Sequence, residues 1–380
     1  MVAHAFDWAS SICLSHQHLP SASVPATRHS VWAKLTSVVA VTVLSVSTLA
    51  LTGCGRQTES MLPPTATPSE KVARDENSPG GKSLAEVVHE KQSISPAMLE
   101  SWLSNPSLRR LKLSGSDIDD AGLAKLADKA KLELLDVTDC EAITSEGIRS
   151  IGKMTSLRNL RVSGAAVNDQ SVQSLAGLDR MAALSLQQTA VTDEGIDVVR
   201  PMRGLKELNL YGTPVTDASL ATIASLPSLQ KLRLRGTGVL GQRAESFAQM
   251  AQVVDLDLSE TKFGSEGLAS VGKMPKLVRL NLWLTEVDDA GIESLASLKA
   301  LTHLNLDNVS GITDRSLDRI SEMGELELLH LGGTSVTAAG LPRLYSLKNM
   351  KSLFVTRLGL TDQEVASLRE AMPWVEKLES

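Results

Sequence analysis

One sequence pattern recurs at nearly constant spacing from Leu108 to the end of the chain. Its clearest copy is residues 205–228, LKELNLYGTPVTDASLATIASLPS, and related copies follow about every 24 residues. The first half, L-x-x-L-x-L, has the alternation expected of a short strand. The second half, after Thr216 and Asp217, has the apolar spacing of one short amphipathic helix. Self-similarity at a fixed period is typical of a solenoid, whose repeats bury their apolar side chains against each other.

The strand pattern begins eleven times, and its spacing is 24 residues, or 25 after Leu132 and Leu301. The first residues are Leu108, Leu132, Leu157, Met181, Leu205, Leu229, Val253, Leu277, Leu301, Leu326 and Met350; a truncated twelfth copy begins at Val375. Strands stack about 4.8 Å apart, whereas packed helices need about 8–10 Å, so the helix side must be longer. We therefore predict an α/β solenoid with a parallel β-sheet on its concave face and short helices on its convex face.

These residues resemble the leucine-rich-repeat superfamily over 108–380, as about eleven repeats and a truncated one. The two long repeats, with VTDCEAIT at 137–144 and LDNVSGITD at 306–314, resemble the cysteine-containing subclass known from F-box proteins, which recruit substrates to ubiquitin ligases. Other repeats carry threonine in the same turn: Thr189, Thr213, Thr237, Thr261, Thr285 and Thr334. A turn buried between layers needs paired backbone groups, so we expect these hydroxyls to bond them. Cys140 fills the same position and is expected to be a structural thiol.

Threonine–aspartate pairs stand where each helix is expected to begin. Examples are Thr192–Asp193, Thr216–Asp217 and Thr313–Asp314. Threonine caps free amides and aspartate favours the positive end of a helix, so we interpret these acids as caps, not catalytic groups. Glycines two residues on (Gly122, Gly147, Gly195, Gly267, Gly291 and Gly340) are expected to let the helix approach the sheet closely. Residues 239–247 lack the pair and carry Arg243 where a small residue belongs, so the helix of that repeat is expected to be displaced outward.

The segment before the repeats divides into a tether and a capping helix. Residues 54–94 contain several prolines and glycines with little apolar periodicity, which predicts a disordered tether, with a short helix over 83–91. Residues 95–107 predict a helix that covers the open end of the first repeat. Ser95 is its expected N-cap, Pro96 its first residue, and Leu99, Trp102 and Leu103 share one face.

An apolar run at residues 35–51 follows Arg28 and Lys34 and ends in Leu-Thr-Gly-Cys54. It is short for a membrane span, and its basic flank is typical of a secretory signal. The last four residues resemble the lipobox of bacterial lipoproteins. The resemblance implies a signal peptide over 1–53, with an over-extended start, and several acyl chains on Cys54 that anchor the protein to a membrane of the bacterial cell envelope. The alternative is an uncleaved signal anchor in which Cys54 is incidental.

Composition argues against several other classes of protein. The net charge of -6 is too mild for a nucleic-acid partner, and lysine and arginine are scattered without a basic stripe. The three cysteines, Cys13, Cys54 and Cys140, are too far apart for a disulfide framework. No Gly-x-Ser-x-Gly, HExxH or complete glycine-rich nucleotide loop occurs. We therefore expect no enzymatic activity, no metal and no cofactor.

The strand positions that flank the second leucine should face outward on the concave side. From these we select a candidate binding strip: Tyr211, Arg233, Arg235, Asp257, Arg279, Trp283, His303 and Asp307. One interpretation is a solvated charge ladder that favours register, with Lys231 beside Asp255 beside Arg279 and Arg233 beside Asp257. The other is a protein-recognition strip anchored by Tyr211 and Trp283, since aromatics and arginine dominate interface hot spots. A metal site from Asp255, Asp257 and His303 or His330 is disfavoured, because these come from separate strands.

Three functions are compatible with this pattern. The first is an exported, lipid-anchored, non-enzymatic protein that binds another protein through its concave face, with the repeats outside the cytoplasm. The second is a substrate adaptor like the F-box leucine-rich-repeat proteins, although residues 55–106 are too polar and proline-broken for the helical segment of about forty residues that it requires. The third is an envelope enzyme with a cryptic concave site.

Overall fold

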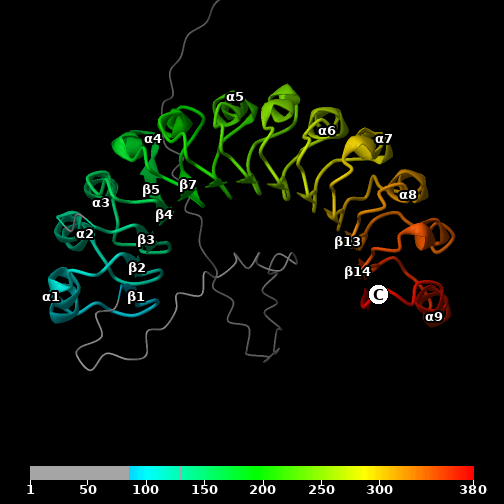
Figure 1. Ribbon diagram of the computed structural model, residues 1–380, viewed down its shortest axis with the longest axis horizontal. Helices are drawn as coiled ribbons and strands as arrows, with labels where there is room; N and C mark the ends of the chain where they lie inside the picture. Colours follow the sequence, from blue (N-terminus) through cyan, green and yellow to red (C-terminus); the bar gives the residue numbers. More distant parts are fainter. Residues whose placement is uncertain (1–84, 129–130) are drawn as a thin grey trace, which may run out of the picture. The chain divides into compact units, whose positions relative to one another are not determined.

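The computed structural model describes residues 85–128 and 131–380. The leader, Cys54 and most of the expected tether lie outside the described residues. The unit Ser78–Ser380 is compact by itself. Figure 1 shows this unit as an arc, with the strands along its inner side and the helices along its outer side. The predicted solenoid is therefore confirmed.

A 13-stranded parallel sheet forms the concave face. The eleven expected strands are β2 (Arg110–Lys112), β3 (Leu134–Val137), β4 (Asn159–Val162), β6 (Ala183–Ser185), β8 (Glu207–Asn209), β9 (Lys231–Arg233), β10 (Asp255–Asp257), β11 (Arg279–Asn281), β12 (His303–Asn305), β13 (Leu328–His330) and β14 (Ser352–Phe354). The truncated repeat adds β15 (Lys377–Glu379) beside β14. Each strand pairs in register with the next, so the central leucines stack, as Leu208 does on Leu232. The leucines of each repeat are buried together, with Leu205, Leu208 and Leu210 at most 1% exposed.

Short helical segments follow the strands on the convex side (Figure 1). The α-helices are α1 (Pro96–Ser104), α2 (Asp120–Ala127), α3 (Ser145–Ile151), α4 (Asp169–Val172), α5 (Leu220–Ala224), α6 (Ser265–Val271), α7 (Asp289–Glu293), α8 (Asp314–Ile320) and α9 (Asp362–Ala371). Tighter 3₁₀ turns are η1 (Gln173–Gly177), η2 (Gly195–Val199), η3 (Asp217–Ser219), η4 (Ala244–Gln249), η5 (Ser294–Ser297) and η6 (Leu341–Ser346). The helical segments of several repeats are so short that they adopt the 3₁₀ form, where a regular α-helix was expected.

The first repeat is covered at its open end by two elements. The expected capping helix is α1, in which the Ser95 hydroxyl accepts from the Met98 amide at 3.2 Å and Leu99 and Trp102 are buried. The short helix expected over 83–91 is wrong. That stretch holds strand β1 (Glu86–Val88), paired with β2, because β-branched Val87 and Val88 suit an extended edge strand that continues the sheet.

The aspartates of the Thr-Asp pairs do more than sit at helix starts. Each threonine hydroxyl caps its helix as expected; Thr216, for example, accepts from the Ala218 amide at 3.2 Å. Asp193, however, reaches forward to the next repeat, where the Thr216 amide and hydroxyl donate to it at 2.8 and 2.6 Å. The same bridge joins Asp120 to Thr144, Asp169 to Thr192, Asp289 to Thr313 and Asp314 to Thr337. We call this series the aspartate ladder, and it ties successive repeats together on the convex side.

Four of the six glycines expected to bring the helix close to the sheet have a different cause. A Cβ on Gly147, Gly195 or Gly340 would collide with the ladder aspartate of the preceding repeat. At Gly291 it would lie 2.6 Å from the Ser265 hydroxyl. The prediction of close approach to the sheet is therefore wrong for these four glycines, which make room for a side chain that links the repeats. At Gly122 and Gly267 the added carbon would instead lie 2.4 Å from the Ile118 and Phe263 side chains, so these two let the helix pack closely on the core of its own repeat.

The irregular repeat at 239–247 keeps the ladder through backbone groups. The amides of Leu240, Gly241 and Gln242 donate to the Asp217 carboxylate at 3.1, 3.1 and 2.9 Å. Its turn η4 has no side-chain N-cap. Buried Phe247 packs edge-on against Phe263, with ring centroids 5.9 Å apart. A second small sheet, β5 (Gly164–Asn168) with β7 (Thr189–Ala190), marks the other irregular connection.

Within the described ranges, no helix is long and apolar enough to cross a bilayer.

Candidate functional site

Three residues of the candidate strip meet at the ends of their strands. The Arg235 guanidinium lies 5.0 Å from the centroid of the Tyr211 ring and 5.0 Å from that of the Trp283 ring. Arginine over an aromatic face is attracted by the negative face of the ring. Tyr211, Arg235 and Trp283 follow strands β8, β9 and β11 at the same position of their repeats, so stacking in register brings them together.

Glu260 holds the arginine of this cluster in place. Arg235 Nε and Nη2 donate to the two Glu260 carboxylate oxygens at 2.8 and 3.1 Å. This fork-to-fork pair is geometrically specific, and it raises the pKa of Arg235 above its ordinary value. The Arg235 side chain is only 17% exposed, which leaves its edge available to a partner while its orientation is fixed. We call Tyr211, Arg235, Glu260, Trp283 and the adjacent Leu284 the rim cluster.

Trp283 and Leu284 both adopt arrangements that lower the stability of the fold. The Trp283 indole nitrogen is buried and has no hydrogen-bond partner among the described residues. Leu284 has φ 55 and is 50% exposed. The matching position of other repeats is also left-handed and carries residues such as Gly212, Gly236 and Asn308, which tolerate that backbone better than leucine. An orphaned donor and an exposed leucine in strained backbone are features that stability alone does not favour.

Arg279 and Arg233 of the strip form ion pairs along the sheet. Arg279 Nε lies 3.1 Å from Asp255, and Arg233 lies 3.7 Å from Asp257. These two contacts agree with the predicted charge ladder. Lys231 departs from it, because its ammonium lies 2.7 Å from Glu207 on the other neighbouring strand.

The predicted outward exposure is wrong for Asp257 of the strip and for several other strand positions that flank the second leucine. Asp257 is 4% exposed, and Asp255, Ser259, Asn281 and Asn305 are also buried. On a concave sheet, long side chains from neighbouring strands lie over the shorter ones between them. Burial raises the pKa of Asp257, and hydrogen bonds from the Ser259 amide and hydroxyl, at 3.1 and 2.6 Å, only partly offset it. Asp257 is therefore a structural group and does not face a partner.

His303 and Asp307 lie farther along the sheet. His303 Nδ1 is 2.7 Å from the Thr302 hydroxyl, and burial followed by the charge of Arg279 lowers its pKa. Asp307 pairs with Arg357 and lies 3.6 Å from His330 Nδ1. His330 stacks on Phe354 with centroids 4.7 Å apart, and burial lowers its pKa. This second group begins on the strand next to the rim cluster, and the Leu284 amide donates to the Asp307 carbonyl at 3.0 Å.

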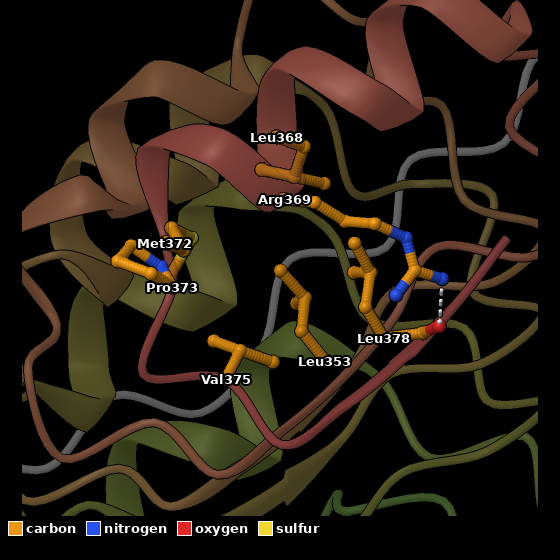
Figure 2. Close-up of a pocket in the computed structure, with 7 residues that line it drawn as sticks. All are labelled: Leu353, Leu368, Arg369, Met372, Pro373, Val375 and Leu378. Atoms are coloured by element: carbon orange, nitrogen blue, oxygen red, sulfur yellow. Dashed lines mark hydrogen bonds between the residues drawn. The ribbon is translucent and has the colours of Figure 1, made fainter.

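Neither a metal site nor an enclosed ligand pocket accompanies these residues. In residues 85–128 and 131–380, no three His, Cys, Asp or Glu side chains are grouped so that they could hold a metal ion. A hollow of about 110 Å³ lies under α9, as Figure 2 shows. It is lined by Leu353, Leu368, Arg369, Met372, Pro373, Val375 and Leu378, and Arg369 donates to the Leu378 carbonyl at 3.0 Å. Because its walls are mostly apolar and Arg369 is already hydrogen-bonded to the chain, we interpret the hollow as a packing gap in the last repeat.

Sequence reasoning found Tyr211, Arg235 and Trp283 but missed Glu260 and Leu284. Both occupy the left-handed position that follows each strand. Glycine fills that position in several copies, so the substitution of glutamate and leucine in adjacent repeats was the available signal.

Comparison with known proteins agrees with this architecture. A family model described as "Leucine Rich repeat" matches residues 104–127 and 129–152. An internalin (inlF) from Listeria monocytogenes superposes with a TM-score of 0.55 at 19% identity, over 78% of this chain and 87% of that one. The chain has a leucine-rich-repeat fold. The repeats in the family model are the first two of the leucine-rich-repeat array, and the structural likeness extends along the rest.

Two receptors give weaker superpositions. The peptide hormone receptor RGFR1, solved in complex with RGF2, gives a TM-score of 0.39 at 15% identity, over 76% of this chain and 56% of that one. A TDR receptor gives 0.43 at 14%, over 70% and 42%. The chain thus spans about half of each receptor. A search of curated protein sequences finds no match.

Proposed function

We propose that this protein is an exported, lipid-anchored leucine-rich-repeat protein that binds another protein through the rim cluster and catalyses no reaction. Solenoids of this kind present extended concave surfaces suited to protein partners. The observation that carries the proposal is the Tyr211–Arg235–Trp283 sandwich. Tyrosine, tryptophan and arginine are the residues most enriched in interface hot spots.

The rim cluster has the preorganisation that binding requires. Glu260 fixes the Arg235 fork, and the two rings fix its plane, so little side-chain freedom remains to be lost on association. Leu284 places an exposed apolar side chain directly beside this polar group. An apolar contact next to a rigid charged group fits a protein segment that offers a hydrophobic side chain and a carboxylate or carbonyl.

The anchoring half of the proposal is supported by residues 35–54 alone. The basic flank, the apolar run and Leu-Thr-Gly-Cys54 resemble a lipoprotein signal. Mass spectrometry of the native N-terminus tests this directly. We expect a chain that begins at acylated Cys54; an unmodified Cys54, or an intact leader, would contradict the anchor.

The binding half is tested by capture from the native cells. Trp283 and Tyr211 are exchanged together for alanine, and Lys262 and Arg315, both exposed at the starts of convex segments, are exchanged for alanine as a control. We expect the first variant to lose the partners that the unaltered protein and the control retain. Equal recovery by all three proteins would contradict a role for the rim cluster.

A further inference from the structure

The edge of the array at which the strands start is basic in the first five repeats. Its cations, here called the basic edge, are Arg109, Lys131, Arg158, Arg180, Arg203 and Lys206; all are exposed except half-buried Arg109. They are spread over about a hundred residues of sequence, so the expectation of scattered basic residues without a stripe is wrong for these repeats. Stacking in register is what gathers them.

Backbone hydrogen bonds show that this row is continuous. The amide of Glu133 donates to the Arg109 carbonyl at 2.7 Å, and the amide of Arg158 donates to the Glu133 carbonyl at 2.8 Å. The row continues through Ala182 to Lys206 in the same way, at 2.7 and 2.8 Å. An open hollow of about 220 Å³ lies within it, lined by Arg109, Lys131, Glu133, Ser156, Arg158 and Arg180.

Most of this charge has no internal counterion. Among the described residues, no ion pair involves any cation of the basic edge. The same turns carry three carboxylates, Asp128, Glu133 and Asp179. The opposite edge of these repeats, where the helices start, is acidic instead: Asp117, Asp119, Asp120, Asp139, Glu141, Glu146, Asp169, Asp193 and Glu194. The edge at which the strands start therefore attracts anions, and the edge at which the helices start repels them.

We propose that the basic edge docks on the anionic phosphate headgroups of a lipid membrane. The choice of a membrane as the source of the phosphate rests on the anchored arrangement proposed above. The predicted tether from Cys54 to β1 has about thirty residues, and β1 pairs with β2, next to Arg109. An anchor at Cys54 would thus hold these repeats, and not the later ones, nearest the lipid.

Two features favour a membrane over nucleic acid. No aromatic side chain is interleaved with the cations of the basic edge, so bases would have nothing to stack on. Surface charges act within about one Debye length, about 8–10 Å, so an edge held against lipid gains from several cations at once. The strands run from this edge toward the rim cluster, which follows the strand ends. Docking would therefore leave Tyr211, Arg235 and Trp283 on the side away from the membrane.

Vesicle binding by the full chain with Cys54→Ser, which has no acyl chain, tests the proposal. Vesicles of phosphatidylglycerol mixed with phosphatidylcholine are compared with pure phosphatidylcholine vesicles. The variant R158E/R180E is compared with K262E/R315E, which makes the same change of charge at the opposite edge. We expect R158E/R180E to bind the anionic vesicles at least about tenfold more weakly and K262E/R315E to bind within about twofold of the parent.

Four outcomes would overturn the proposal, three of them in the binding comparisons. These three are equal losses in both charge-reversed variants, equal binding to both kinds of vesicle, and stronger binding of the parent to single-stranded DNA than to anionic vesicles. Competition by inorganic phosphate that abolishes vesicle binding would assign the hollow to a free phosphate ligand and equally contradict docking. The mass of the native N-terminus is read separately. An unmodified Cys54 with intact vesicle binding would refute the anchor and leave the lipid affinity of the basic edge established.

Discussion

The guanidinium of Arg235 lies 5.0 Å from the centroid of the Trp283 ring, although the two residues belong to repeats that are not adjacent. The repeat between them carries Ser259 at the matching position, and its small side chain is fully buried. A larger residue there would separate the arginine from the indole. The contact therefore depends on three repeats at once, which is possible only in an array stacked in strict register.

The aspartate ladder should be a main source of coupling between repeats. Asp193→Ala removes three acceptor contacts, to the Thr216 amide, the Thr216 hydroxyl and the Ser219 hydroxyl. We expect a loss of about 2 kcal/mol in the free energy of unfolding, because three hydrogen bonds to a charged acceptor are removed. Chemical denaturation measures this. A lower denaturant slope in the variant would indicate that the array unfolds in parts.

Two aspartates should have opposite effects on the pH dependence of stability. Burial opposes ionisation of Asp193, but hydrogen bonds from Ser219 and Thr216 outweigh it and hold its pKa below the usual value. Its contribution to stability is therefore present above the unfolded pKa of about 3.9 and is lost as pH falls through the lower folded value. Burial raises the pKa of Asp257, so its folded form favours the proton and stability falls as pH rises above about 3.9.

Asp193→Asn and Asp257→Asn, compared by denaturation from acid to neutral pH, separate these effects. We expect Asp193→Asn to weaken the loss of stability at acid pH and Asp257→Asn to weaken the loss toward neutral pH. Slopes that change in the same direction in both variants would contradict the assignment.

Gly340 should not tolerate a side chain. Its Cβ would collide with the carboxylate of Asp314, which bridges to Thr337. We expect Gly340→Ala to destabilise the protein by about 1–3 kcal/mol, within the range for overpacking. Gly177 and Gly324 have no atom within 4 Å of the added carbon, so alanine at either position serves as the control. Equal stability of all three variants would show that the ladder has room to move.

Leu284 should be retained for binding at the expense of stability. Its backbone has φ 55, and asparagine tolerates this conformation better than leucine. We expect Leu284→Asn to raise the free energy of unfolding by about 0.5–1 kcal/mol and to weaken capture of the partner. Thermal denaturation and capture are measured on the same preparation. A destabilised variant with unchanged capture would contradict the interpretation.

Cys140 should be inert in the folded protein. Its thiol donates to the Leu113 carbonyl at 3.1 Å, and burial raises its pKa. We expect alkylation of the peptide that contains Cys140 only after unfolding, and a change of less than about 1.5 kcal/mol for Cys140→Thr, since threonine fills this position in other repeats. Thr213, for example, donates to the Leu210 carbonyl at 2.7 Å. Rapid labelling of the native thiol would refute a structural role.

The strands could be predicted because each of eleven repeats has the same alternation of buried leucines and outward-facing residues. The position of Tyr211 beside Arg235 followed from register alone. Strand β1 could not be found in this way, because residues 86–88 belong to no copy of the repeat and form a strand only by pairing with β2. The burial of Asp257 was missed because it depends on side chains from neighbouring strands. Likewise, Glu260 was missed because its partner is 25 residues away in sequence.

Photo-crosslinking at the rim cluster shows directly whether a partner protein binds there. A photoreactive residue replaces Leu284 in one protein and Ala269, exposed on the convex helix α6, in another. After irradiation in the native cells, we expect one defined protein adduct from position 284, absent from position 269 and lost when Arg235→Glu is added. Adducts of equal identity and yield from both positions, or an adduct at 284 that is unaffected by Arg235→Glu, would contradict binding at the rim cluster.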